Sequence, residues 1–379
     1  MALLDGVAFA LDQRLAGFEL SGDGKAFTLI FREHGTRRPP HTAAISGVRF
    51  GQMGMISACT RLLLMNLGVW DQFMRDGHAP SPAILSAWGQ EQLYENHFIY
   101  HPYGHGWHLD RRRFDAMLAQ AAEKAGARVC RGARVTTCQE LGSQGWQVEF
   151  VLDGKRGRLQ SSFLVHATGR TSVGGRWQRT KRIFYDRLVG LIGFFSSSAL
   201  GGGPDYQTLV EAAEDGWWYS AWLPNARLVV AYMTDADLMP SSNRHTHKHW
   251  QSRLEQAPHT YARVRGNLLE PGLRRLAANS YRRDRLTGKH WLAVGDAATA
   301  FDPLSSQGIY HALESGLQAA LAIKHWWLGD HNALAVYACA IQQRFDEYLH
   351  LRTMYYGREE HWPSSPFWQR RQAVQDASD

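Results

Sequence analysis

The segment that most constrains the fold of this chain covers residues 291–310 and reads WLAVGDAATAFDPLSSQGIY. Its first residues are apolar and predict a buried strand over 291–294, which delivers Asp296 to a turn. A second turn at 303–308 precedes a long apolar stretch, which predicts a helix that continues through Trp327. The start of such a helix presents free backbone N–H groups and the positive end of the helix dipole. The segment therefore predicts a site for an electron-rich ligand at the helix start.

The same residues resemble the C-terminal flavin motif of FAD-dependent monooxygenases with the p-hydroxybenzoate hydroxylase architecture, a group that includes flavin-dependent halogenases and geranylgeranyl reductase-like proteins. The resemblance implies FAD as the cofactor. It implies that Asp296, which follows Gly295, hydrogen-bonds the ribityl or pyrophosphate part of FAD. It also implies that the backbone at the helix start faces the N1/C2 carbonyl edge of the isoalloxazine ring. The candidate residues for that contact are Pro303, Ser306, Gln307, Gly308 and Ile309.

A strand predicted over 163–169 ends in Ala-Thr-Gly-Arg, which resembles the family's Asp-Ala-Thr-Gly element near the FAD adenosine and pyrophosphate. His166 stands where an acid is common in that element. The resemblance implies that Gly169 and Arg170 contact the cofactor. A glycine suits this role because a backbone that approaches a phosphate closely tolerates no side chain.

The tripeptide Leu-Asp-Arg at 109–111 resembles a third element of the family, in which the arginine starts a helix and lies beside FAD. The resemblance implies that Arg111 contacts a phosphate or the ribityl chain. The alternative is that Asp110 caps the following helix and that the three arginines at 111–113 are solvated.

The middle of the chain predicts a helix packed on a sheet. Residues 114–125 place four apolar side chains on one helix face, and Gly126 suits the C-cap before a strand over 127–130. Residues 146–152 predict a strand that turns at Asp153-Gly154 and returns over 163–169.

Residues 183–284 alternate between aromatic strands and turns, which predicts an antiparallel sheet that forms the substrate layer. Alternation along the strand 217–223 places two sets of side chains on opposite faces. We expect Trp218, Ser220 and Trp222 to line a cavity for a flat aromatic or isoprenoid substrate, while Trp217, Tyr219 and Ala221 form the other face.

Three further helices are expected over 61–73, 252–261 and 332–360, the last of them packed across the FAD domain. The histidines of 245–249 have no flanking acid or cysteine, so we expect a solvated loop rather than a metal site. The expected fold class is α/β, an α+β composite with a Rossmann-like FAD-binding domain. Its expected divisions are an atypical N-terminal segment (1–55), the two parts of the FAD-binding domain (56–180 and 285–330), an inserted antiparallel-sheet substrate domain (181–284) and C-terminal helices (331–379).

The first 55 residues depart from the family, which opens with a strand, Gly-x-Gly-x-x-Gly and a helix. The glycines at 22–24 and 51–54 do not lie between an apolar strand and a helix, and residues 15–31 predict a β-hairpin instead. Three explanations stay open: a divergent way of holding FAD, a truncated or frame-altered copy, and a non-catalytic binding partner that kept the fold.

Composition argues against several classes of protein, among them disulfide-rich, zinc-binding, nucleic-acid-binding and membrane-spanning proteins. Of the 379 residues, 44% are hydrophobic, which supplies the core of a globular protein. The four cysteines are far apart, without the spacing of a zinc site or a disulfide framework. The basic residues behind the net charge of +7 are scattered and accompany no nucleic-acid-binding module. No apolar run approaches the roughly 20 residues that span a bilayer, so we expect a soluble cytoplasmic protein without a transmembrane segment.

The expected activity is that of an FAD-dependent oxidoreductase, a monooxygenase that hydroxylates a small aromatic molecule or a protein-borne tryptophan, with NAD(P)H as a candidate electron donor. A geranylgeranyl reductase-like isoprenoid reductase and a cofactor-poor binding partner are the alternatives. Halogenation is disfavoured, because flavin-dependent halogenases need a lysine early in the chain and none occurs between Lys25 and Lys124. The catalytic acid or base is not identified. His97, His105 and His108 are candidates by residue type, although a structural role is favoured for each.

Overall fold

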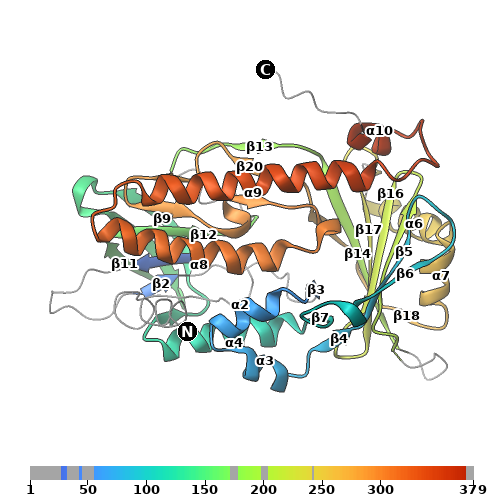
Figure 1. The fold of residues 1–379 in the computed structure, drawn as a ribbon, viewed down its shortest axis with the longest axis horizontal. Helices are drawn as coiled ribbons and strands as arrows, with labels where there is room; N and C mark the ends of the chain where they lie inside the picture. The colour runs from blue at the N-terminus through green and yellow to red at the C-terminus, as the bar shows by residue number, and fades with distance from the viewer. Residues whose placement is uncertain are drawn as a thin grey trace.

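The computed structural model describes residues 27–31, 42–44, 55–170, 178–197, 204–240 and 243–372. Two long helices, α8 (Gly308–Trp327) and α9 (Ala333–Tyr356), run side by side along the molecule, and a large sheet closes one end (Figure 1). The helix expected through Trp327 is confirmed, and α9 confirms the helix expected over 332–360. Residues 15–31 were expected to form a hairpin. The first strand of that hairpin lies outside the described residues, and the second strand corresponds to β1 (Phe27–Phe31).

A four-stranded sheet lies under the two helices in the order β1-β12-β22-β21. Its central strands β12 (Phe163–Ala167) and β22 (Trp291–Ala293) are parallel, and Leu164 pairs with Trp291. The outer strands β1 and β21 (Thr287–Gly288) are antiparallel to their neighbours. Parallel strands end at the same edge of a sheet, so the residues after β12 and after β22 meet there.

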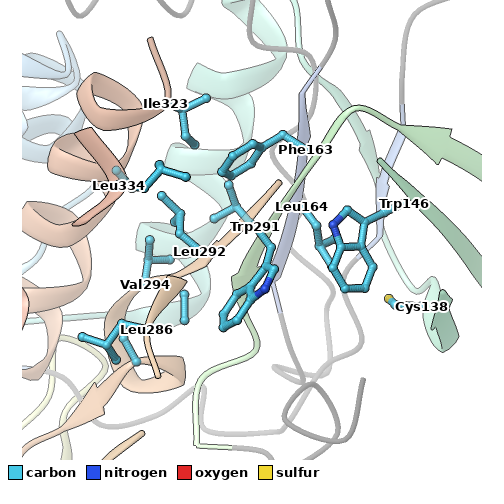
Figure 2. Close-up of a cluster of buried hydrophobic side chains, with 14 of the residues drawn as sticks. Cys138, Trp146, Phe163, Leu164, Leu286, Trp291, Leu292, Val294, Ile323 and Leu334 are labelled. Atoms are coloured by element: carbon cyan, nitrogen blue, oxygen red, sulfur yellow. The ribbon is translucent and has the colours of Figure 1, made fainter. Parts of the chain in front are cut away.

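The largest core cluster joins this sheet to α8 and α9 (Figure 2). Phe163 and Leu292 from the sheet are fully buried, and Ile323 of α8 and Leu334 of α9 belong to the same cluster. The hydroxyl of Tyr337 on α9 also donates a hydrogen bond of 2.7 Å to the carbonyl of Ala293. Because apolar burial on both faces fixes β12 and β22, the loops that follow them start from rigid positions.

The second large sheet has the order β18-β14-β17-β16-β15-β5-β6. Neighbouring pairs among its strands β14 to β17 are antiparallel, as the sequence predicted for the substrate layer. Two of its strands, β5 (Ala83–Ala87) and β6 (Tyr94–His97), come from a segment that the sequence assigned to the FAD-binding part. The polar strand β6 is exposed and carries no apolar alternation, which explains why sequence reasoning did not place it in the sheet. The other strands of this sheet are β14 (Leu188–Ser196), β15 (Thr208–Ala213), β16 (Gly216–Trp222), β17 (Arg227–Asp235), β18 (Leu268–Leu269) and β19 (Arg274–Ala277).

Four local predictions need correction. The hairpin strand β10 (Trp146–Leu152) returns as β11 (Lys155–Ser161), whereas β12 leaves the hairpin and joins the parallel pair. The histidines of 245–249 lie on a helix, α6, rather than in a loop. Two expected helices are each divided. The helix expected over 252–261 is split by Pro258, and the helix expected over 61–73 is broken at Gly68, whose φ of +67° is left-handed. The resulting pairs are α6 (Asn243–Glu255) with α7 (Pro258–Val264) and α2 (Thr60–Asn66) with α3 (Trp70–Arg75).

The helix expected over 114–125 is confirmed as α4 (Arg111–Lys124), which Gly126 follows with a φ of +93° before β8. Within the described ranges, no helix is long and apolar enough to cross a bilayer. The remaining elements are β2 (Thr42–Ala44), β3 (Met55–Ile56), β4 (Ala79–Ser81), β7 (Gly106–His108), β8 (Arg128–Cys130), β9 (Arg134–Glu140), β13 (Arg182–Phe184), β20 (Tyr281–Arg283), β23 (Thr299–Ala300), α10 (Pro366–Gln372) and the short 3-10 turns η1 (Phe98–Tyr100), η2 (Gly142–Gln144), η3 (Gly295–Ala297) and η4 (Pro303–Ser305).

Candidate functional site

The loops after β12 and β22 bring two predicted cofactor residues into contact. Nε of Arg170 lies 3.4 Å from Oδ2 of Asp296. The arginine is held from its other side, since its Nη1 donates to the carbonyl of Asn279 at 2.7 Å and its Nη2 to that of Phe301 at 2.5 Å. The Asp296 side chain keeps 30% of its surface exposed, so it remains open to a ligand. The parallel pairing of β12 and β22 thus builds one polar corner from two separate motifs.

The two glycines of these motifs have different structural roles. Gly295 has a φ of +53°, and a Cβ there would lie 3.2 Å from Cβ of Ala312 on α8. Its N–H donates to Oγ of Ser315 at 2.9 Å, so this glycine allows the loop to pack on the helix. Gly169 has a φ of +56°, and a Cβ there would meet no atom within 4 Å. The space beside Gly169 fits the close approach of a ligand that the sequence predicts.

The start of α8 has the features of an anion-binding helix terminus. Gln307 is the N-cap residue, and no side chain caps the free N–H groups of the first turn. The preceding Ser306 has a left-handed φ of +52°. Gly308 is exposed, and a Cβ at this position would meet no atom within 4 Å. Ile309 packs into the core beside α2 and α4. The N–H of Ser306 donates to the carbonyl of Pro303 at 3.0 Å and that of Gln307 to Oγ of Ser305 at 3.3 Å, so the free N–H groups of the helix begin at Gly308.

The turn before α8 is fixed by Asp302, which accepts a hydrogen bond from the N–H of Leu304 at 2.9 Å and so caps the turn that begins at Pro303. A capped turn, an uncapped helix start and the partly exposed Asp296 carboxylate together fit the ring edge and the polyol chain of a flavin.

Arg111 begins α4, and Asp110 caps that helix by accepting from the N–H groups of Arg112 and Arg113 at 3.0 and 3.2 Å. The capping that the sequence offered as the alternative is therefore present. Arg111 itself pairs with Asp115 one turn later, at 3.2 Å. Its contact with a cofactor stays a prediction.

The residues expected to line the substrate cavity pack elsewhere. The side chains of Trp218, Ser220 and Trp222 are buried, and Trp218 stacks on Tyr232 with ring centroids 4.7 Å apart. That face of β16 packs with α6 and α7. The opposite face carries Trp217, and it shares a cluster with Leu304 of the turn before α8. The face of Trp217, Tyr219 and Ala221 is therefore the one that lies toward the flavin motif, and a substrate contact of the other face stays a prediction.

Burial gives three histidines a structural environment. His108 bonds Oγ1 of Thr208 at 2.8 Å and the carbonyl of Trp222 at 2.9 Å, and burial lowers its pKa to about 4. Burial first, and then the charge of Arg283, lowers the pKa of His166 to about 3. His311 bonds Thr299 at 2.8 Å, and burial lowers its pKa to about 4. Because the neutral form dominates near pH 7, these side chains can form their hydrogen bonds in the interior without a buried charge.

The other two candidate histidines lie closer to the surface. His105 packs against Trp107 with ring centroids 4.4 Å apart, and His97 is exposed beside Glu95, 3.0 Å away. Among the residues that the structure describes, no group of three or more His, Cys, Asp or Glu side chains could hold a metal ion.

The structure adds three residues that sequence reasoning missed. The hydroxyl of Tyr281 donates to the carbonyl of Asp296 at 2.6 Å, and Nε of Arg283 donates to that of Ala297, also at 2.6 Å. Arg182 stacks over Tyr281 at 4.6 Å. These residues lie on β13 and β20, strands with no motif of their own, so tertiary packing alone brings them to the site. A cavity of 190 Å³ lies between β20 and α9. Arg283 lines it, whereas none of the residues that the sequence predicted for the site does.

Comparison with known proteins extends these observations. The sequence pattern of the tryptophan halogenase family matches residues 50–379. The FAD-dependent oxidoreductase LodB of Marinomonas mediterranea is 29% identical over 333 residues, which cover 86% of this chain and 88% of LodB. The chain spans about half the length of the curated halogenases that it matches, such as tryptophan 2-halogenase of Chondromyces crocatus.

Solved structures share the fold. The flavin-dependent halogenase CmlS superposes with a TM-score of 0.79 at 20% identity and covers 99% of this chain and 66% of its own. The peptidyl tryptophan dihydroxylase QhpG, essential for tryptophylquinone cofactor biogenesis, superposes with a TM-score of 0.70 at 24% identity and covers 87% and 72% of the two chains. The expected α/β fold class and the resemblance to the flavin-dependent halogenase group are confirmed.

Proposed function

This chain belongs to the tryptophan halogenase family, and we propose that it is an FAD-dependent oxidoreductase that inserts oxygen into the ring of a protein-borne tryptophan. The observation that carries the proposal is the corner where Arg170 and Asp296 meet at 3.4 Å beside the uncapped start of α8. FAD supplies the redox chemistry of such a reaction when it is bound. The chain itself supplies binding, orientation and exclusion of water.

Each part of the corner has a distinct role in the proposal. Asp296 accepts hydrogen bonds from the ribityl hydroxyls, and Arg170 holds that carboxylate in its orientation. The free N–H groups of the first turn of α8, which begin at Gly308, stabilise negative charge on the ring edge, because a helix start carries a partial positive charge. The apolar face of β16 with Trp217 keeps the adjoining space dry, which strengthens these electrostatic contacts.

The substrate class rests on two similarities. LodB is a relative matched over most of both chains, and QhpG, a structural neighbour, is named for dihydroxylation of a peptidyl tryptophan. The buried aromatic face of Trp217 and Tyr219 near the flavin motif suits an indole better than a charged molecule. Reduced flavin comes from NAD(P)H, directly or through a reductase, under the same proposal.

Halogenation is the second candidate, since halogenases dominate the matched relatives. The absence of lysine from 26 to 123 argues against it, because the halogenases of this group need a lysine in the early part of the chain to hold the halogenating species. An assay that supplies both oxygen and a halide separates the two reactions.

The test starts with purified protein that is desalted after incubation with FAD, with flavin absorbance as the readout. The loaded protein then receives NADH, a flavin reductase, oxygen, bromide and a tryptophan-containing peptide, and mass spectrometry records the product. We expect retained flavin and an oxygenated peptide. A brominated peptide would establish halogenation. Reduction of an isoprenoid without oxygen consumption would establish a reductase. A protein that never binds FAD would favour the alternative of a non-catalytic binding partner.

A further inference from the structure

Asp302 lies at the centre of a buried hydrogen-bond network between the turn before α8, helix α9 and the large sheet. Asp302 is 1% exposed, and its hydrogen bond to Leu304 is only one of its contacts. Oδ1 accepts from the N–H of Leu304 at 2.9 Å, while Oδ2 accepts from the hydroxyl of Tyr356 on α9 at 2.8 Å. One carboxylate thus fixes both the turn and its distance from α9.

The hydrogen bonds of the network are donated in one direction, from Trp217 to Tyr356 and from Tyr356 to Asp302. The indole N–H of Trp217 on β16 donates to the oxygen of Tyr356 at 2.9 Å. An indole nitrogen can only donate, so the tyrosine oxygen accepts there and its own O–H is free to donate to Asp302. The three side chains form a relay from the large sheet, through α9, to the turn that leads into α8. Trp217 lies on the β16 face that packs toward Leu304 of the same turn.

A second set of contacts holds the backbone of Asp302. Its N–H donates to the hydroxyl of Tyr348 at 2.7 Å, and that hydroxyl also bonds Oγ of Ser280 at 2.6 Å. Nη1 of Arg352 donates to Ser280 at 2.9 Å and to Asp186 at 2.6 Å. The side chains of all these groups are buried, so each broken contact leaves a polar atom without a partner in a low-dielectric interior.

We infer that Asp302 and Tyr356 are positioning residues that couple β16 of the substrate sheet to the backbone at 303–308, where the flavin ring is proposed to bind. The inference rests on the proposed function, since this coupling matters to activity only when flavin occupies the start of α8. Neither side chain is proposed to touch the flavin or the substrate. The two residues fix the position of the free N–H groups of α8. A displacement of Trp217 would therefore move these N–H groups as well.

The main test is Tyr356→Phe, which removes one hydroxyl and leaves Oδ2 of Asp302 and the indole N–H of Trp217 without partners. The matched control is Tyr355→Phe on the same helix, because Tyr355 is 51% exposed and its hydroxyl lies outside the relay. FAD binding is measured by quenching of flavin fluorescence, together with the absorption spectrum of bound flavin and thermal unfolding without FAD. We expect Tyr356→Phe to weaken FAD binding by about tenfold, as for loss of one charge-assisted hydrogen bond, and to shift the flavin spectrum.

Asp302→Asn serves as a second variant of nearly the same shape, in case Tyr356→Phe does not fold. It keeps the Oδ1 cap and places an amide N–H against the tyrosine hydroxyl, so we expect the same direction of change. Equal FAD affinity and spectra in Tyr356→Phe and Tyr355→Phe would overturn the inference. Lower thermal stability with unchanged FAD affinity would overturn it too, because the role would then be structural alone. A wild-type protein that binds no FAD would instead overturn the proposed function.

Discussion

The guanidinium of Arg170 and the carboxylate of Asp296 face each other across the edge where β12 and β22 end, with 3.4 Å between Nε and Oδ2. Each residue comes from a different motif, and each stands within a few residues of its own strand. The pair is partly buried, so it orients Asp296 more firmly than an ion pair on an open surface would.

Asp296→Asn is expected to weaken FAD binding at least about tenfold, because the neutral amide loses both the pair with Arg170 and the acceptor for charge-assisted hydrogen bonds. Titration of FAD followed by fluorescence measures the change. Glu123→Gln is the control, since it breaks another arginine–carboxylate pair, with Arg131 at 2.8 Å, far from the motifs. Equal affinities in the two variants would contradict a role for Asp296 at the cofactor.

Gly295→Ala is expected to cost more stability than Gly169→Ala. Both glycines have a left-handed φ, which penalises alanine by about 1–2 kcal/mol. The Cβ added at position 295 would in addition press on Ala312 at 3.2 Å, whereas position 169 is open within 4 Å. Urea unfolding of both variants measures the difference. If FAD approaches Gly169 closely, Gly169→Ala should weaken FAD binding more than Gly295→Ala does. An unchanged FAD affinity of Gly169→Ala would exclude that approach.

Arg111→Met is expected to weaken FAD binding, while Arg112→Met is expected to leave it unchanged. The two residues are neighbours at the start of α4, but Arg112 is exposed and Arg111 is partly buried against Asp115. The pair with Asp115 contributes only about 0.3–0.5 kcal/mol to stability, so a structural role predicts similar small losses of stability in both variants. FAD titration of both variants distinguishes the two roles. Identical affinities in Arg111→Met and Arg112→Met would show that Arg111 only stabilises helix α4.

Folding stability is expected to fall as the pH drops from about 6.5 toward 4. Burial lowers the pKa of His108 and His311 to about 4 and that of His166 to about 3, from a usual 6.5. The unfolded chain therefore binds more protons than the folded chain in this window, and each histidine contributes a slope of about 1.4 kcal/mol per pH unit. Above pH 6.5 the three histidines are neutral in both states, and this contribution is fully present.

His108→Gln is expected to flatten that slope between pH 6 and pH 5, as measured by urea unfolding at each pH, because one of the three proton-binding sites is gone. His97→Gln is the control, since the His97 side chain is 54% exposed. The same slope in wild type and His108→Gln would contradict a pKa of His108 that is lowered in the folded protein.

Much of the fold followed from local sequence. The strand at 291–294, the helix from Gly308 through Trp327 and the helix from Ala333 were expected from apolar periodicity, because burial of one face demands that pattern. The polar strand β6 and the split of the helix at Pro258 were missed. The first depends on pairing with β5, which no local pattern records, and the second depends on where a fixed proline φ interrupts a helix.

The sequence by itself determined the motifs, their order and the family to which they point, because glycine, aspartate and apolar residues at fixed spacing encode strand, turn and helix start. Only the tertiary structure decided which motifs meet. The parallel pairing of β12 with β22 brings Arg170 to Asp296, and the burial of α6 and α7 on one side of β16 turns Trp217 rather than Trp218 toward the flavin motif. Alternation gives two faces to a strand, but the elements that pack on each face decide which of them lies toward the site.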